Sequence, residues 1–79
     1  MVAIYKCKRC GKQYGSFHAG RELARTFIVC ISINDTSVLK NLNVWADRFE
    51  AHNCEDDGIG LAEFIGFDTE EGETTDAKP

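Results

Sequence analysis

Apolar and polar residues alternate at the amino-terminal end of the chain. In the segment VAIYKC, residues 2–7, the apolar side chains recur at alternate positions, which predicts a strand. The following CKRCG, residues 7–11, predicts a tight turn because Gly11 tolerates a positive φ. Residues 12–17, KQYGSF, then return as the second arm of a hairpin.

The next apolar segment, RELARTFIVCISIN at residues 21–34, fits both a helix and a strand. Leu23, Phe27, Cys30 and Ile31 recur at helical spacing, whereas the β-branched isoleucines and valine of the same run favour a strand. We favour the helix because the segment begins, directly after a glycine, with the strong helix formers RELA.

A second helix is predicted in NDTSVLKNLNVWADRFEAH, residues 34–52. The segment begins with residue types that cap helices, and Val38, Leu42, Trp45 and Phe49 fall on one helical face. This segment has to return the chain to the first hairpin.

The last apolar segment, GLAEFIGFD at residues 60–68, is expected to form a strand that pairs with the amino-terminal strand. The remaining TEEGETTDAKP, residues 69–79, has no large apolar side chain and is expected to be a disordered acidic tail. We therefore predict one domain at residues 1–68. Its class is α+β, with one or two helices inserted into a small sheet.

Size and cysteine content both point to a stabilising cross-link. A chain of 79 residues is near the limit below which a hydrophobic core alone rarely holds a fold. No apolar signal segment follows Met1 and no apolar stretch is long enough to cross a bilayer, so we expect a cytoplasmic protein without membrane contact. Cytoplasmic thiols stay reduced, which favours a metal site over disulfides.

The candidate metal ligands are two pairs far apart in the sequence. Cys7 and Cys10 form a CxxC motif, which places two thiolates about 3.5–4 Å apart, as a tetrahedral zinc with bonds of about 2.3 Å requires. His52 and Cys54 form the second pair, because side chains two residues apart in an extended segment project to one side. We expect one Zn²⁺ per chain, bound by these three cysteines and one histidine.

Two other residues compete for a place in this site. His18 is the rival nitrogen ligand, although it has no partner at ligand spacing. Cys30 lies in the apolar run TFIVCISI, where a free cysteine most often behaves as a small buried apolar residue. A redox role for the CxxC pair is disfavoured because the residues after it are neither apolar nor helix-forming.

The amino-terminal CxxC within residues 4–15 and the ending AHNCEDDGIGLAEFIGFD at residues 51–68 together resemble small, uncharacterised zinc-ribbon-type proteins of phages and bacteria. The resemblance implies a ribbon-like zinc site and a terminal strand, and it implies no enzymatic activity. The ligands it implies are Cys7, Cys10, His52 and Cys54.

An enzymatic role is not expected. A catalytic zinc usually keeps one position open for water, whereas four good protein ligands are available here. Glu55, Asp56 and Asp57 directly follow the last ligand, but an acidic run of this kind is typical of a solvated turn. The HxE and CxxC order of zinc deaminases is absent from the sequence.

Charge is distributed unevenly along the chain. Residues 1–30 contain six basic residues and one acidic residue, a net charge of +5, whereas residues 31–79 contain three basic and twelve acidic residues, a net charge of −9. We expect a protein-interaction or accessory module whose partner is another protein. The alternative is a nucleic-acid-binding ribbon in which cations around the first turn contact phosphates; these cations are Lys6, Lys8, Arg9 and Lys12. The sequence leaves the oligomeric state open.

Overall fold

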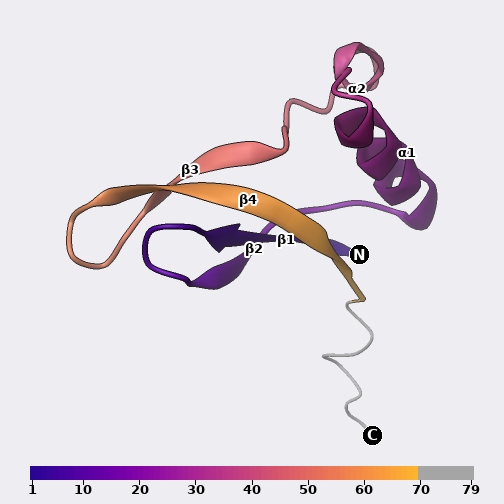
Figure 1. Cartoon of the computed structure of the whole chain (residues 1–79). Coiled ribbons are helices and arrows are strands. Elements are labelled where there is room, and N and C mark those ends of the chain that lie inside the picture. Colours follow the sequence, from indigo (N-terminus) through magenta and orange to yellow (C-terminus); the bar gives the residue numbers. More distant parts are fainter. Residues whose placement is uncertain (70–79) are drawn as a thin grey trace, which may run out of the picture.

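The computed structural model of the chain describes residues 1–69 (Figure 1). Within this range the elements are β1 (Val2–Cys7), β2 (Gln13–His18), α1 (Arg21–Ser32), α2 (Ser37–Asn41), β3 (Phe49–Asn53) and β4 (Ile59–Asp68). The predicted α+β class is confirmed, and both helices lie between the two hairpins. Of the predicted disordered tail, residues 69–79, all but Thr69 lies outside the described residues.

Four antiparallel strands form one sheet in the order β2-β1-β4-β3. Its two hairpins, β1–β2 and β3–β4, are joined along β1 and β4, so the expected pairing of the first and last strands is confirmed. β1 ends at Cys7, which is paired with Ala62 near the start of β4. The turns of both hairpins therefore lie next to each other at one end of the sheet, on the left in Figure 1.

The sheet is curled, and its two edge strands, β2 and β3, are linked by side chains. The Tyr14 hydroxyl donates a hydrogen bond to Glu50 Oε2 (2.5 Å), and the Ser16 hydroxyl donates one to Glu50 Oε1 (3.1 Å). The Tyr14 ring also stacks on the His52 ring, with 4.8 Å between the ring centroids. We call this contact between β2 and β3, made by Tyr14, Ser16, Glu50 and His52, the seam.

A bulge in β4 directs two phenylalanines to the same side. Ile4 pairs with Gly66 and Tyr5 pairs with Phe64, so Ile65 is an extra residue opposite β1. A regular strand would place Phe64 and Phe67 on opposite faces, because side chains alternate. With the bulge, both rings pack against the buried residues of the helical layer.

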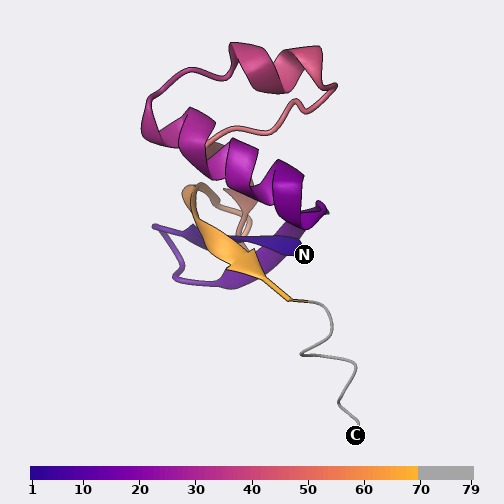
Figure 2. The same cartoon turned by 90° about the vertical axis from the view of Figure 1, so that its right-hand side faces the viewer.

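Helix α1 lies across the sheet, and α2 lies on the far side of α1 (Figure 2). The buried residues of α1 are Ala24, Phe27 and Cys30, which recur every three residues and so share one face of the helix. The Phe27 ring contacts the Phe64 ring edge to face, with 4.9 Å between the ring centroids. The preference for a helix and the burial of Cys30 are both confirmed.

The predicted second helix is largely wrong. Helix α2 ends at Asn41, and Phe49 belongs to β3 instead of a helical face. The helix stops because Asn43 adopts a left-handed conformation (φ 62°), which asparagine tolerates better than most residues. Leu39 is the fully buried residue of α2, whereas Trp45 is 74% exposed. The predicted apolar face therefore does not exist.

Among residues 1–69, no helix is both long and apolar enough to span a membrane.

Candidate metal centre

The first hairpin turn directs backbone amides at a sulfur. The Cys10 amide donates to Cys7 Sγ at 3.5 Å, and the turn is closed by a hydrogen bond from the Gly11 amide to the Cys7 carbonyl oxygen (2.8 Å). Gly11 adopts φ 79°, a conformation that glycine reaches at little cost. The turn thus brings Cys10 back beside Cys7, as the CxxC spacing predicts.

The second turn is closed in a related way. The Cys54 amide donates to the Gly58 carbonyl oxygen (2.8 Å), and the Asp57 amide donates to the Cys54 carbonyl oxygen (3.1 Å). Asp57 has φ 69°, and the Asp56 carboxylate accepts a hydrogen bond from the Gly58 amide (3.1 Å). The acidic residues after Cys54 therefore shape the turn.

The structure brings the four predicted ligands together. The ligand atoms of Cys7, Cys10, His52 and Cys54 all lie within 4.8 Å of one another, although Cys10 and His52 are 42 positions apart in the sequence. Two of the distances run between the hairpins. Cys7 Sγ lies 3.8 Å from Cys54 Sγ, and Cys10 Sγ lies 3.6 Å from His52 Nδ1. Cys54 Sγ to His52 Nδ1 is 3.8 Å.

These separations match a tetrahedral ion. Bonds of about 2.3 Å to sulfur and about 2.0 Å to nitrogen place two sulfurs about 3.8 Å apart and a sulfur and a nitrogen about 3.5 Å apart. The cluster can therefore hold a metal ion without a large rearrangement of its side chains.

The two buried cysteines of the cluster, Cys7 and Cys54, have different electrostatic surroundings. The Cys10 and Arg9 amides lower the pKa of Cys7 to about 6, with the Cys10 amide contributing most, although burial acts in the opposite direction. Burial raises the pKa of Cys54, against the effect of a hydrogen bond from the Arg9 guanidinium. The Cys7 thiol therefore loses its proton more readily than the Cys54 thiol, and protons compete with a metal more strongly at Cys54.

Arg9 belongs to the surroundings of this cluster. Its Nη1 donates to Asp56 Oδ1 at 2.8 Å, and both this carboxylate and the Cys54 sulfur raise the pKa of Arg9. The guanidinium lies directly over Gly58, where an added Cβ would come within 2.3 Å of Arg9 Cζ. Sequence reasoning assigned Arg9 only to phosphate contacts and missed this position beside the Cys54 sulfur.

Gly60 is the second residue of the site that sequence reasoning missed. A Cβ at Gly60 would lie 2.4 Å from Cys7 Sγ and 3.5 Å from Cys54 Sγ, so a side chain cannot be accommodated there. Glycine inside a strand often marks the close approach of another group. The second glycine of GIGLAEF, Gly60, was therefore a signal in the sequence that another group approaches the strand here.

The two rival ligands lie elsewhere. Cys30 is buried between Phe27 and Leu39 in the core under α1. His18 is at the end of β2 and does not belong to the cluster found among the described residues.

Most of the cations proposed for phosphate contacts are ion-paired. Lys8 Nζ lies 3.1 Å from Glu63 Oε1, and Arg9 is bound to Asp56. Lys12 Nζ lies 3.8 Å from Glu55 Oε2. Lys6 is exposed on β1.

The fold and the cluster together define a small α+β protein whose curled four-stranded sheet holds three cysteines and one histidine at metal-binding distance. No family model matches the chain, and neither a curated protein nor a solved structure is significantly similar to it. The function is therefore inferred from the residues of the chain itself.

Proposed function

We propose that this is a small, non-enzymatic zinc protein whose metal is structural and whose helical part binds another protein in the cytoplasm. The observation that carries the proposal is the spacing of the Cys7, Cys10, His52 and Cys54 donor atoms, which agrees with tetrahedral coordination. Three thiolates and one imidazole favour zinc over harder ions such as Mg²⁺ or Ca²⁺.

The site resembles a zinc ribbon in one respect. Each of two adjacent hairpins contributes one ligand pair, Cys7 and Cys10 from the first and His52 and Cys54 from the second. This arrangement is consistent with the resemblance to small zinc-ribbon-type proteins of phages and bacteria that the sequence suggests.

A structural role fits the donor set better than catalysis. Four protein ligands fill a tetrahedral zinc and leave no position for water. Of the nearby carboxylates, Asp56 is bound to Arg9 and to the Gly58 amide, so it is not placed to act as a general base.

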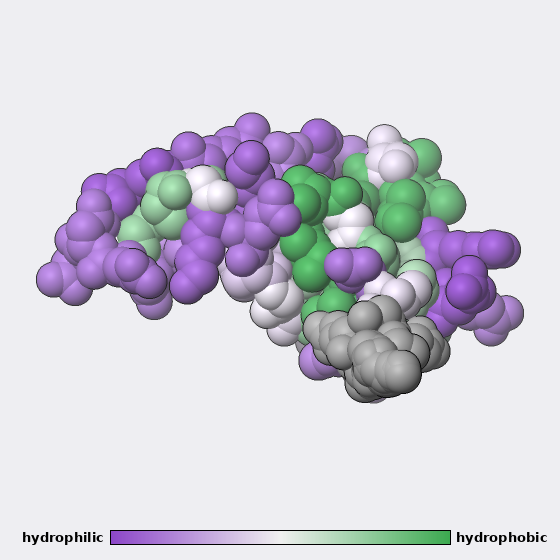
Figure 3. Space-filling model, turned by 90° about the horizontal axis from the view of Figure 1, so that it is seen from below, coloured by the Kyte–Doolittle hydropathy of each residue, from purple (hydrophilic) through white to green (hydrophobic). Residues whose placement is uncertain are grey.

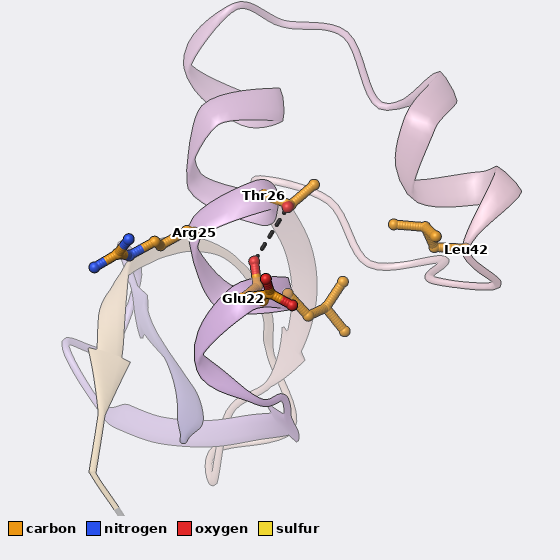
Figure 4. A pocket seen from close by; sticks show the side chains of 5 residues that line it. Glu22, Arg25, Thr26 and Leu42 are labelled. Carbon is orange, nitrogen blue, oxygen red and sulfur yellow. Dashed lines mark hydrogen bonds between the residues drawn. The ribbon is translucent and has the colours of Figure 1, made fainter.

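A groove beside α1 supports the interaction role. It is lined by Glu22, Leu23, Arg25, Thr26 and Leu42, and Leu42 points toward α1 from the far wall (Figure 4). The Thr26 hydroxyl is satisfied by the Glu22 carbonyl oxygen at 3.1 Å. An adjoining hollow shares Arg25 and Thr26 and is lined further by Val29, Cys30, Ile33 and Val38. Such a groove suits an amphipathic helix, with Arg25 facing an acidic residue of the partner.

The distribution of apolar surface agrees with this assignment. Seen from below, the end of the sheet that carries the two turns is mostly hydrophilic, and apolar residues gather toward the helical end (Figure 3). Val29 and Ile33 on α1 are 57% and 65% exposed, and Leu42 is 54% exposed. The metal end and the interaction surface would thus be separate.

Nucleic-acid binding is the weaker alternative. Lys8, Arg9 and Lys12 are each paired with a carboxylate, so phosphate contacts would have to displace these pairs. The net charge of −4 adds a long-range repulsion.

Elemental analysis and chelation test the proposal. After metal-replete expression we expect one zinc per chain, and a strong chelator should abolish the cooperative thermal transition until zinc is restored, because so small a core depends on its metal. Less than about 0.3 zinc per chain in a protein that still melts cooperatively would contradict a structural zinc.

A photo-crosslinking residue tests the interaction surface. Introduced at Ile33, in the hollow that adjoins the groove, it should capture a partner that the same residue at exposed Gln13 on β2 does not capture. A synthetic helix from the captured protein should then bind the purified chain and lose affinity for Val29→Asp. Equal capture from both positions, or a helix that binds the variant equally well, would reject the groove.

A further inference from the structure

We propose that Tyr14 and Glu50 are positioning residues for His52, and that they set the affinity of the metal site through the seam between β2 and β3. The inference rests on the proposed metal site and names what holds its only nitrogen ligand in place. Neither residue belongs to the metal cluster itself.

His52 differs from the other three ligands in its backbone surroundings. Cys7, Cys10 and Cys54 lie in or next to turns closed by backbone hydrogen bonds. His52 instead lies within the edge strand β3, which has a backbone partner, β4, on one side only. Something other than the sheet has to fix the direction of its ring.

The Tyr14 ring supplies that restraint. It stacks on the imidazole at a centroid distance of 4.8 Å and an interplanar angle of 19°. In this orientation His52 Nδ1 is 3.6 Å from Cys10 Sγ and 3.8 Å from Cys54 Sγ. Rotating the imidazole away from the sulfurs would break the stacking, so the stack favours the orientation in which the ring can bind a metal.

Glu50 fixes Tyr14 in turn. Its carboxylate accepts hydrogen bonds from Tyr14 Oη (2.5 Å) and Ser16 Oγ (3.1 Å). Glu50 and His52 are two residues apart on β3, and Tyr14 and Ser16 are two residues apart on β2, so each pair projects from one face of its strand. The carboxylate therefore connects the two edge strands directly beside the ligand.

This arrangement has the geometry of outer-shell support in metal sites. Groups that orient a ligating histidine typically change metal affinity about 10–100-fold when they are removed. Tyr14 would act by stacking and Glu50 by a charge-assisted hydrogen bond to the stacked ring's hydroxyl.

The chain contains a matched control for the loss of a tyrosine hydroxyl. Tyr5 is fully buried, and its hydroxyl donates to the Asp47 backbone oxygen. Tyr5→Phe therefore removes a tyrosine hydroxyl that is bonded to neither Glu50 nor His52, and it keeps the Tyr5 ring beside the Tyr14 ring (6.2 Å between the ring centroids).

Zinc affinity, measured by competition with a chromophoric chelator, tests the proposal. Tyr14→Leu, which removes the stack, should weaken zinc binding about 10–100-fold. Tyr14→Phe and Glu50→Gln, which keep the ring, should weaken it less, and Tyr5→Phe should leave it unchanged. Equal losses for Tyr14→Phe and Tyr5→Phe would mean that only general stability had been lowered, and would overturn the proposal.

A double-mutant cycle separates positioning from packing. In a His52→Ala background, Tyr14→Leu should cause no further loss of zinc affinity, because its effect passes through the imidazole. Additive losses would overturn the inference. A wild-type chain that binds no zinc would instead reject the proposed metal site, which is a different outcome.

A spectroscopic measurement on the wild-type protein tests the orientation of His52 even where the variants fail to fold. In ¹⁵N-resolved spectra of the zinc-loaded chain, His52 should bind through Nδ1 and carry its proton on Nε2, and its ring protons should be shifted upfield by the Tyr14 ring. Coordination through Nε2, or the absence of the ring-current shift, would contradict the stacked arrangement.

Discussion

Gly60 shows how far the candidate metal centre depends on residues that bind nothing. The backbone of β4 passes so close to the sulfurs of Cys7 and Cys54 that a single methyl group would meet both. Arg9 lies beside the same strand, and its guanidinium pairs with the Asp56 carboxylate and interacts with the Cys54 sulfur. A site with three thiolates needs both space and a compensating cation.

Gly60→Ala should weaken metal binding and destabilise the fold by about 1–3 kcal/mol, because the new methyl group overpacks the sulfurs. The control is Gly20→Ala, since a Cβ at Gly20 meets nothing within 4 Å. Zinc content and thermal melting of both variants measure the effect. Zinc binding by Gly60→Ala with wild-type affinity would show that the strand does not approach the sulfurs this closely.

Cys30→Ala should retain one zinc per chain and lower the free energy of unfolding by about 1–2 kcal/mol, the cost of a small cavity beside Phe27 and Leu39. Zinc titration and urea unfolding provide the measurement. If Cys30→Ala loses its zinc while His52→Ala keeps it, the sulfur of Cys30 is a ligand and the proposed donor set is wrong.

At the scale of residues, the sequence was informative where chemistry is local. The CxxC and HxC spacings are properties of a few neighbouring residues, so the four residues of the cluster could be named in advance. The approach of Gly60 and the Tyr14–His52 stack depend on which strands become neighbours, and no short motif encodes that.

At the scale of elements, the first hairpin, α1 and the terminal strand could be predicted because each has one dominant pattern. The segment after α1 could not, because its apolar residues match a helical repeat that the chain does not follow. Asn43 turns the chain through a left-handed conformation, and the Val44 amide donates to the Leu39 carbonyl oxygen at 2.8 Å. The bulge at Ile65 is likewise a tertiary effect, since it serves to bring Phe64 and Phe67 to one side.

Two leucines distinguish the short α2 from the predicted long helix. Leu39 is fully buried, so Leu39→Ala should lower the free energy of unfolding by about 2–5 kcal/mol. Leu42 is 54% exposed, and Leu42→Ala should stay within about 0.5 kcal/mol of the wild type. Denaturant unfolding of the zinc-loaded variants gives both values. The reverse order would restore the predicted helical face.

At the scale of the whole molecule, the seam closes the curled sheet. It joins the two edge strands near the metal cluster, so the edges are partly protected from pairing with other chains. Both tyrosines of the chain, Tyr5 and Tyr14, lie near this contact and interact electrostatically with the Glu50 carboxylate. Burial, followed by Glu50, raises the pKa of Tyr5 and of Tyr14 above the ordinary value of about 10.

The raised tyrosine pKa values predict a loss of stability at alkaline pH. A raised pKa in the folded state means that the stabilisation is complete below pH 10, the ordinary tyrosine value, and decreases as the pH rises above it. Absorbance at 295 nm should show no tyrosinate in the folded protein at pH 10, whereas the urea-unfolded chain should be about half ionised. Equal titration curves for both states would contradict the buried, hydrogen-bonded tyrosines.

X-ray absorption at the zinc edge of the purified protein tests the donor set most directly. Coordination by Cys7, Cys10, His52 and Cys54 predicts three sulfurs at about 2.3 Å and one imidazole nitrogen at about 2.0 Å, with the nitrogen replaced in His52→Ala. A first shell of four sulfurs, or one with two or more oxygens or nitrogens, would contradict the Cys3His site.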